Sequence, residues 1–591
     1  MFRSIKRFSK MKYLFLILFS VSLFSQSTRI FMDGKFDDWV IVNNGYIDNT
    51  HDGTGIDFHS FYVTNDENFL YIKFKLTPEI KLQEITSEAP TLYIDGDNKS
   101  NTGIQVNGIG AELKWNFGTR NGSFVKSSTT TIRYDKIQLR YLPTVTSEEY
   151  ELAIGRFVKP DNVNFLFTSD TIKIQFKNEK SNGDLMPNAG TTFSYVFDNT
   201  PLPPYEVINI NKSDSTFLRV MTYNVEFDGL MDVNKQPMYQ RIFNAIKPDI
   251  ITFNEFFNTT AEQVRTVMTQ LYPLPCAAPW YAIKLDAGNV TLSRYPFKQH
   301  WAVYPGQRIT ASLIDLSLYY PSDLLLINCH LRCCTADDIR QREADAIIAF
   351  LRDAKTDGGI ITLPPKTPFM IAGDLNLVGY SQQLRTLLNG EIVNTSTYGT
   401  SGPPDWDSTS LEDLYSYHTD KPTAYTWRDD SQSYSPGRLD FMIYSNSVMK
   451  VEKSFVLQTE VMPLDRLSMY ELKQTDTKSA SDHFPKIADF SFITTTGFTE
   501  KPEVNGFALL QNYPNPFNPK TSISYQLSTS GNVVLKLFDV LGNEVATLVN
   551  EHKPTGKYEV QFDGTNLTSG IYFYRIQSGS YIETKKMILM K

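Results

Sequence analysis

The sequence predicts a multidomain, β-rich protein: an N-terminal β-sandwich, a central α/β sandwich and a C-terminal immunoglobulin-like β-sandwich. The 591 residues are enough for three or four domains at about 100–200 residues each. Apolar segments that alternate with polar residues recur near both ends, which is typical of half-buried strands. The stiff stretch PLPP and a soft, Thr-rich stretch interrupt the chain. We therefore expect domains at 28–200, 217–493 and 507–591, with linkers at 201–216 and 494–506.

The composition excludes several classes of protein. A hydrophobic fraction of 41% with only 21% charged residues does not suit a disordered chain. The formal net charge of -8 argues against non-specific coating of nucleic acid. Only 4 cysteines accompany 32 tyrosines and 39 phenylalanines, which favours β-rich domains that do not depend on many disulfides. We expect a monomer.

Residues 1–25 have the pattern of a secretory signal peptide. Basic residues between Lys6 and Lys12 precede an apolar run from Tyr13 to Phe24, and Ser25 follows it. The run is shorter than the roughly 20 residues that span a bilayer. We expect the protein to be secreted or held at the outer cell surface; a membrane anchor at the N-terminus is the alternative.

The first block, 28–200, is predicted to be a β-sandwich because alternating segments such as 69–75 and 91–95 are separated by turn residues. The opening MDGKFDDW at 32–39, the segment TNDENFLYI and an Asp-Gly-Asp-Asn turn resemble family-nine carbohydrate-binding modules and related DOMON-like domains. The resemblance implies a glycan partner. Trp39 could stack on a sugar, although a single Trp in a sandwich is more often a core residue.

The acidic turn of this block is a candidate calcium site. It contains Asp95, Asp97 and Asn98, and Asn101 and Gly103 follow. Clustered oxygen ligands near a glycine can hold Ca²⁺. The alternative is an ordinary hairpin turn, since no distant bidentate glutamate is evident in the sequence.

Six apolar segments of the central block adjoin polar residues. The polar groups are Asn224, Asn254 with Glu255, His330, Asp374 with Asn376, Asp440, and Asp482 with His483. One such group alone would be a turn or a satisfied surface residue. Six on buried strands indicate one rim that collects polar side chains.

The order of these segments resembles the endonuclease/exonuclease/phosphatase superfamily over about 217–491. That superfamily includes pancreatic-type deoxyribonucleases, abasic-site endonucleases, neutral sphingomyelinases and inositol polyphosphate phosphatases. The matching motifs are TYNVE (222–226), PDIITFNE (248–255), NVTLSRYP (289–296), NCHL (328–331), GDLN (373–376), GRLDFMIYS (437–445) and SDHFP (481–485). The family more often has Gln at position 254, and both residues are amides.

The resemblance implies a hydrolase that depends on Mg²⁺ or Mn²⁺. Glu255 would hold the cation with help from Asn224 and Glu226, because hard divalent ions prefer oxygen ligands, phosphate and water. Asp482 would support the metal or a water molecule.

The resemblance also implies the catalytic residues. Asp374 would orient or deprotonate the attacking water, and Asn376 would hydrogen-bond the phosphoryl oxygens. His483 would be the acid/base or charge stabiliser, with Asp440 fixing its tautomer. His330 would donate to the developing negative oxygen.

A helix is predicted over 338–351, because Ile339, Ala346, Ile347 and Phe350 recur at helical spacing. We expect its arginines to be solvated. Packed outside the strands, it would complete a two-layer α/β sandwich, or four layers (α-β-β-α) when both sheets are counted.

The cysteines leave alternatives open. Cys329, Cys333 and Cys334 surround His330, and the fourth is Cys276. In an exported protein a disulfide from Cys276 to Cys333 or Cys334 is plausible. Buried thiols are the alternative, and a zinc site is disfavoured because there is no second closely spaced pair.

The last block is predicted to be a small antiparallel sandwich. Val533, Leu535 and Leu537 alternate with polar or half-buried positions, and a hairpin turn is expected at Leu541-Gly542-Asn543. The run QNYPNPFNP and nearly all that follows resemble the type A C-terminal sorting domain of the type IX secretion system. The resemblance implies an interaction with that machinery and export across an outer membrane.

The substrate is a separate prediction. Residues 217–493 hold 25 Lys and Arg against 32 Asp and Glu, so the block is acidic and has no broad basic footprint. Extracellular nucleic acid is the first prediction. A phospholipase C or sphingomyelinase is second and would want an exposed apolar hairpin, for which Leu318-Tyr319-Tyr320 is a candidate unless it is a core pair. A sugar or inositol phosphatase is third. From another class, a glycan-binding surface protein with an inactive catalytic domain is disfavoured by the complete motif set.

Overall fold

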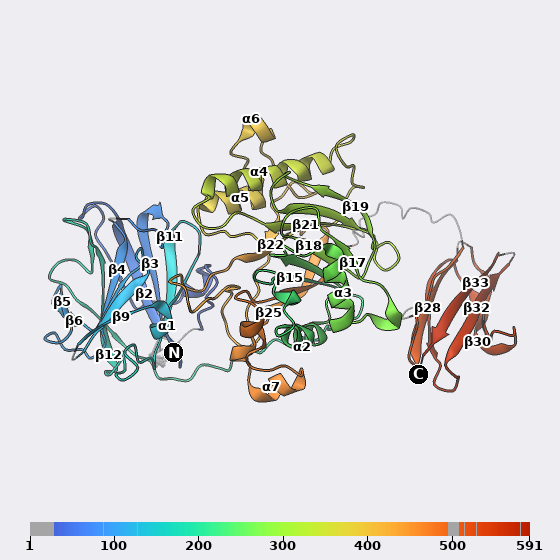
Figure 1. Cartoon of the computed structure of the whole chain (residues 1–591), viewed down its shortest axis with the longest axis horizontal. Coiled ribbons are helices and arrows are strands. Elements are labelled where there is room, and N and C mark those ends of the chain that lie inside the picture. The colour runs from blue at the N-terminus through green and yellow to red at the C-terminus, as the bar shows by residue number, and fades with distance from the viewer. Residues whose placement is uncertain are drawn as a thin grey trace, which may run out of the picture.

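The computed structural model describes residues 29–86, 88–126, 128–493, 507–512, 515–527, 529–579 and 581–590. In Figure 1 the first block (blue to cyan), the central block (green to orange) and the last block (red) follow one another along the chain. The predicted signal peptide and the linker at 494–506 lie outside the described residues. Among the helices that are described, none is both long and apolar enough to cross a membrane.

The first block packs two antiparallel sheets against one hydrophobic core that draws side chains from both. One sheet has the order β1-β2-β3-β11-β10: β1 (Gly45–Ile47), β2 (Asp57–Asn65), β3 (Phe69–Ile80), β10 (Arg140–Leu142) and β11 (Ser147–Gly155). The other has the order β13-β12-β4-β7-β8-β9, with β14 also pairing with β12: β4 (Pro90–Asp95), β7 (Leu113–Asn116), β8 (Asn121–Val125), β9 (Thr129–Ile132), β12 (Thr171–Asn178), β13 (Leu185–Met186) and β14 (Phe193–Val196). Shorter elements are η1 (Asp37–Trp39), the hairpin β5 (Ile104–Val106) and β6 (Ile109–Ala111), and α1 (Tyr134–Ile137).

Trp39 belongs to the interior of this block. Its side chain is 2% exposed, and its indole Nε1 donates to Glu151 Oε2 at 3.0 Å. The ring therefore offers no face to a sugar, so the core reading of Trp39 holds. The glycan partner stays a prediction, and Trp39 does not provide an aromatic surface for it.

The central block contains two six-stranded sheets. The first has the order β17-β18-β16-β15-β26-β25: β15 (Leu218–Asn224), β16 (Ile250–Asn254), β17 (Tyr281–Ile283), β18 (Val290–Ser293), β25 (Met449–Val456) and β26 (Lys486–Phe492). The second has the order β19-β20-β21-β22-β24-β23: β19 (Phe297–Ala302), β20 (Ile309–Ile314), β21 (Leu324–His330), β22 (Phe369–Asp374), β23 (Glu412–Asp413) and β24 (Asp440–Tyr444).

Helices cover the outer face of each sheet. The helices α2 (Gln236–Ile246) and α3 (Ala261–Leu271) pack on the first sheet, and α4 (Asp337–Ala354) and α5 (Ser381–Asn389) pack on the second (Figure 1). A third apolar cluster joins the inner faces, with Val220 from one sheet and Leu326 from the other. The layers therefore run α-β-β-α. The remaining short elements are η2 (Gly229–Met231), η3 (Pro275–Ala277), α6 (Thr395–Tyr398), η4 (Thr459–Val461), α7 (Leu464–Met469) and α8 (Asp476–Ala480).

The predicted helix after His330 is present as α4, but its arginines are not all solvated as expected. Arg340 is fully buried. It donates to Gln383 Oε1 at 2.9 Å and to Asp337 Oδ1 at 2.5 Å. The expectation was wrong because α5 covers this face of the helix, which the sequence of α4 alone does not show.

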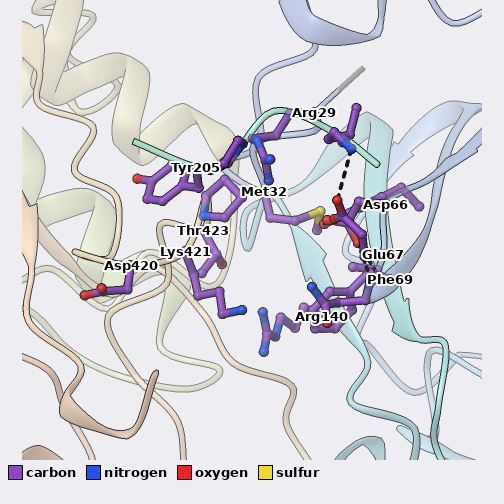
Figure 2. Close-up of a pocket in the computed structure, with 16 residues that line it drawn as sticks. Arg29, Met32, Asp66, Glu67, Phe69, Arg140, Tyr205, Asp420, Lys421 and Thr423 are labelled. Carbon is purple, nitrogen blue, oxygen red and sulfur yellow. Dashed lines mark hydrogen bonds between the residues drawn. The ribbon is translucent and has the colours of Figure 1, made fainter. Parts of the chain in front are cut away.

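The first and central blocks touch. Met32 N donates to Pro422 O at 2.9 Å, and Tyr417 Oη donates to Asp33 Oδ2 at 2.6 Å. A pocket between the blocks is lined from both sides, by residues that include Arg140 and Lys421 (Figure 2). None of its lining residues is among the predicted site residues. We therefore place the chemistry at the strand ends and not in this pocket.

The last block has two sheets, β27-β28-β31 and β30-β29-β32-β33, around one core. Their strands are β27 (Ala508–Leu509), β28 (Lys520–Leu527), β29 (Gly531–Phe538), β30 (Glu544–Lys553), β31 (Gly556–Asp563), β32 (Gly570–Ser578) and β33 (Tyr581–Leu589). Val533, Leu535 and Leu537 are fully buried, as their alternation predicts. The turn is present too: Gly542 has a φ of 83°, a left-handed conformation that suits glycine.

Candidate active site

The strand pairing brings the predicted polar residues to one rim. The parallel strands β15 and β16 align Asn224 with Asn254, and the parallel strands β21 and β22 align His330 with Asp374. The antiparallel strand β24 begins at Asp440, directly opposite Asp374. Because the carboxyl ends of parallel strands meet at one edge, residues from distant motifs become neighbours.

A glycine makes this close approach possible. Gly373 has a φ of 138°, and a Cβ there would lie 1.9 Å from the carbonyl oxygen of Cys329 on the neighbouring strand. No other residue fits between the strands at this point. The Gly of the GDLN motif therefore sets the position of Asp374 against β21.

Two carboxylates at the rim form a candidate metal centre. Ligand atoms of Glu255, His330 and Asp374 all lie within 4.8 Å of one another. Asn224 Nδ2 donates to Glu255 Oε1 at 3.0 Å and to Asp374 Oδ2 at 3.1 Å. Among the ion pairs of the described residues, neither carboxylate has a lysine or arginine partner. Hard oxygen donors without a lysine or arginine partner fit Mg²⁺ or Mn²⁺.

A buried His–Asp pair stands beside that centre. His483 Nδ1 lies 2.8 Å from Asp440 Oδ2, and His483 Nε2 lies 3.7 Å from Asp374 Oδ2. Burial opposes a charged imidazole, but the carboxylates of Asp440 and Asp374 outweigh it and raise the pKa of His483 to about 10. At neutral pH the ring is therefore an imidazolium that points a proton at Asp374.

The other two titratable groups of the rim respond differently. Burial, followed by the charges of Asp440 and Glu255, raises the pKa of Asp374 to about 7 even though His483 lowers it. Burial and the positive charge of Arg308 hold the pKa of His330 well below its usual value. His330 is thus a neutral imidazole, with Nε2 at 3.6 Å from Asp374 Oδ2 and no hydrogen-bond partner for Nδ1 in the described structure. Groups with such separated pKa values are typical of acid–base sites.

Three predicted residues lie at the rim without joining the metal cluster. Glu226 turns toward Lys235, with Oε2 at 2.9 Å from the ammonium group. Asp482 Oδ2 accepts the indole proton of Trp427 at 2.8 Å. Asn376 Nδ2 donates to the carbonyl of Leu331 at 3.1 Å. The roles assigned to these three residues stay predictions.

A network of amides behind the rim received no role from the sequence. Asn254 Nδ2 donates to Asn289 Oδ1 at 2.9 Å and to Asn328 Oδ1 at 3.0 Å. Asn254 Oδ1 accepts from the backbone N of Asp374 at 2.9 Å. These residues tie the two sheets together directly beneath the candidate metal centre. Three buried asparagines, two inside strands and Asn289 directly before β18, were the signal that could have revealed them.

The rim also has a strained, aromatic border. Glu226, Phe227 and Asp228 are three consecutive non-glycine residues with φ between 48° and 61°, a conformation that costs energy and clusters at functional sites. Phe227 is 75% exposed and its ring centroid lies 5.7 Å from that of Phe257. The guanidinium of Arg308 lies 5.9 Å from the Phe257 ring.

A third carboxylate, from Glu112, lies beside the acidic turn of the first block, and the sequence did not indicate it as a candidate metal ligand. Asp95, Asp97 and Glu112 bring carboxylate oxygens within 4.8 Å of one another, whereas Asn98 is exposed in a left-handed conformation. Lys126 Nζ lies 3.1 Å from Asp97 Oδ2 and 3.5 Å from Glu112 Oε1. A lysine thus already supplies positive charge to this cluster.

The predicted disulfide is not formed. Cys329, Cys333 and Cys334 all carry free thiols, so neither predicted partner of Cys276 is bridged. Cys333 and Cys334 are exposed in the turn that follows β21. Of these three, Cys329 fits the alternative of a buried thiol, because it is fully buried in the second sheet.

These features together define a four-layer α/β sandwich with a candidate metal site at one rim. Residues 221–483 match the model of the Endonuclease/Exonuclease/phosphatase family, and residues 511–590 match the Secretion system C-terminal sorting domain. The chain therefore carries an endonuclease/exonuclease/phosphatase domain and a C-terminal sorting domain. The sorting domain indicates secretion or outer-surface attachment through the type IX system.

Solved structures with similarity to the chain include several hydrolases. A beta toxin of Staphylococcus aureus with bound magnesium ions is 17% identical, with 46% of this chain and 99% of that chain covered and a TM-score of 0.27. Sphingomyelinase C from Streptomyces griseocarneus is 16% identical over 46% and 99%, with a TM-score of 0.26. An AP endonuclease from Leishmania major is 13% identical over 49% and 94%, with a TM-score of 0.29. No curated protein matches the chain.

Proposed function

We propose that the protein is a secreted, divalent-metal-dependent phosphodiesterase that cleaves extracellular nucleic acid. The observation that carries the proposal is the convergence of Glu255, Asp374 and His483 at one buried rim, with Asn224 bonded to both carboxylates. The complete set of polar groups disfavours the alternative of an inactive domain that serves only for glycan binding.

The geometry suggests how the residues share the work. Glu255 and Asp374, with Asn224, would hold Mg²⁺ or Mn²⁺, which when bound supplies positive charge against the phosphoryl oxygens. Asp374 is the group that accepts a proton from the attacking water, since its carboxylate is held at the centre of the rim. The imidazolium of His483, fixed by Asp440 at 2.8 Å, neutralises the developing negative charge.

The border of the rim favours nucleic acid over other phosphodiesters. An exposed Phe227 beside Phe257 offers the flat aromatic faces on which unpaired bases stack. Arg308 adds a cationic group next to Phe257. These three residues give the border of the rim surfaces for base stacking and a positive charge, although the block as a whole is acidic.

The sphingomyelinase alternative receives less support. Leu318 and Tyr319 are exposed, at 83% and 54%, whereas Tyr320 is half-buried and packs against the core between the sheets. They follow β20 at Ile314, which pairs with Leu324 at the start of β21, whereas His330 ends that strand. Five or six residues at about 3.3 Å each place this apolar loop far from the rim. A membrane-inserting hairpin there would not deliver a lipid to the site.

The test offers purified mature protein four substrates: plasmid DNA, RNA, sphingomyelin and bis(p-nitrophenyl) phosphate. Each is assayed with Mg²⁺, with Mn²⁺ and with chelator. We expect metal-dependent cleavage of nucleic acid and of the chromogenic diester. Cleavage of sphingomyelin alone would refute the substrate, and inactivity on all four would refute the phosphodiesterase. A double variant, His483→Ala with Asp374→Ala, must be inactive if the site is correct.

A further inference from the structure

A second group of acids, two of them buried, lies in the first block where the loop that joins β1 to β2 meets the segment before β13. Carboxylate oxygens of Asp48, Asp52 and Asp184 lie within 4.8 Å of one another. Asp48 follows β1, Asp52 is in the loop, and Asp184 precedes β13 on the opposite sheet. We propose that these three residues form a calcium site that fastens the loop at 48–57 to the second sheet.

Asp48 is the observation that points to a ligand. Its side chain is only 7% exposed, yet neither Oδ1 nor Oδ2 has a hydrogen-bond partner in the described structure. Asp57, which begins β2 nearby and is 9% exposed, also has no hydrogen bond to Oδ2, although His59 Nε2 lies 3.4 Å from that oxygen. A buried carboxylate without a partner is costly, because burial removes its hydration without replacing it. A cation would supply what these oxygens lack.

The acidic turn at Asp95 is a natural comparison within the same block. There Lys126 lies within 3.5 Å of two carboxylates. Around Asp48, Asp52, Asp57 and Asp184 the described residues provide no lysine or arginine ion pair, and only His59 approaches Asp57, at 3.4 Å. The group is therefore crowded with negative charge and lacks a counter-charge of its own.

The surrounding backbone holds these carboxylates in place. Asp184 Oδ2 accepts from Phe58 N and Oδ1 accepts from Leu185 N, both at 2.6 Å. Thr54 N donates to Asn182 O at 2.9 Å. A Cβ at Gly53 would lie 2.5 Å from Asp184 Cα, so the loop packs directly on the segment that carries Asp184. The site is thus assembled from two segments far apart in sequence.

Calcium suits the donor set better than magnesium does. All candidate ligands are oxygens, and Asp48 offers two free ones, which allows bidentate binding. Asp52 is exposed, so water can complete the six to eight ligands that Ca²⁺ takes. Mg²⁺ demands a regular octahedron and keeps most of its water. An exported protein also meets calcium at the concentrations that extracellular modules bind, with dissociation constants of about 10⁻⁴–10⁻³ M.

The test uses the full chain with calcium chloride as the only divalent salt. We expect 10 mM Ca²⁺ to raise the melting temperature of the first block by about 3–6 °C. The variant Asp48→Asn with Asp184→Asn must lose this shift. The matched control, Asp95→Asn with Asp97→Asn, must keep it. No shift in the native chain, or an equal shift in the Asp48 variant, overturns the proposal, and loss of the shift in the control alone assigns calcium to the other cluster instead.

A variant at an exposed position tests the proposal even if the buried double variant fails to fold. Asp52→Asn changes an exposed side chain and leaves the interior intact. By isothermal titration it should weaken calcium binding at least severalfold while the melting temperature without calcium stays unchanged. Unaltered calcium affinity in this variant would also overturn the proposal.

Discussion

The central block and the first block differ in how often a buried carboxylate is paired with arginine or lysine. In the central block five of them form ion pairs with arginine or lysine: Asp249, Asp413, Asp420, Asp476 and Asp489. In the described part of the first block Asp48, Asp95, Glu151 and Asp184 are buried without any ion pair. At the rim, half-buried Glu255 and buried Asp374 likewise have only histidines as ion-pair partners among the described residues. A buried carboxylate without Lys or Arg is stabilised either by hydrogen bonds, as Asp345 is, or by a proton or a metal ion.

The largest effect should come from the rim. Replacing His483 by Ala removes the imidazolium that Asp440 holds against Asp374. We expect the rate of diester cleavage to fall about 10²–10⁴-fold, measured as kcat on bis(p-nitrophenyl) phosphate. The variant Asp482→Asn, whose carboxylate bonds to Trp427, should lose much less. An equal loss in both variants would show that the His483–Asp440 pair has no special role.

The paired carboxylates of the central block should respond in stability. Arg219 and Asp489 are buried and joined by two hydrogen bonds, one of them from Arg219 Nη2 to Asp489 Oδ2 at 2.7 Å. Arg219→Ala leaves that charge unpaired and should cost about 3–5 kcal/mol of unfolding free energy. The exposed pair of Arg265 with Glu262 is the control, and Arg265→Ala should cost at most about 1 kcal/mol. Urea denaturation of both variants checks this, and similar losses would contradict it.

Only part of this contrast could be predicted from the sequence. The rim residues end or begin neighbouring strands, so apolar runs that end in Asn, His or Asp predict that Asn224, His330 and Asp374 meet. Glu112, between β6 and β7, and Asp184, before β13, join their clusters from segments farther along the chain, and no local pattern indicates which side chains a fold will bring to them. Arg340 was expected in solvent for a related reason, since helical periodicity describes one helix and not the second helix that covers it.

The unpaired Glu151 of the first block offers a pH-dependent test. Its carboxylate is fully buried and accepts from Trp39 Nε1 at 3.0 Å and from the backbone N of Asp33 at 2.8 Å. Burial raises its pKa to about 8. The folded state therefore holds this proton more tightly than the unfolded chain, so stability is greatest below pH 4.5 and falls as the pH rises through 8. The loss is about 1.4 kcal/mol for each unit by which the pKa is raised.

Glu151→Gln keeps the shape of the side chain and removes this titration. Melting temperatures between pH 5 and pH 9 should fall less steeply in the variant than in the native chain. Glu149→Gln is the matched control, because that carboxylate lies nearby on the same strand but pairs with Lys73 at 2.9 Å. Parallel pH profiles for Glu151→Gln and the native chain would mean that Glu151 is already ionised in the folded state.

The smallest effect should appear at the border of the rim, where it separates nucleic acid from simple diesters. The Phe227 ring packs beside the Phe257 ring. Its hydrogen bond to the metal site comes from the backbone, where Phe227 N donates to Glu255 Oε2. Phe227→Ala removes base stacking worth about 1–3 kcal/mol. The kcat/KM on single-stranded DNA should therefore fall roughly 5- to 150-fold. Cleavage of bis(p-nitrophenyl) phosphate should stay the same, since that substrate has no base to stack. Leu318→Ala, at the far end of β20, should change neither rate. A loss on both substrates would mean that Phe227 only shapes the strained turn at 226–228, and the nucleic-acid assignment would lose its main structural support.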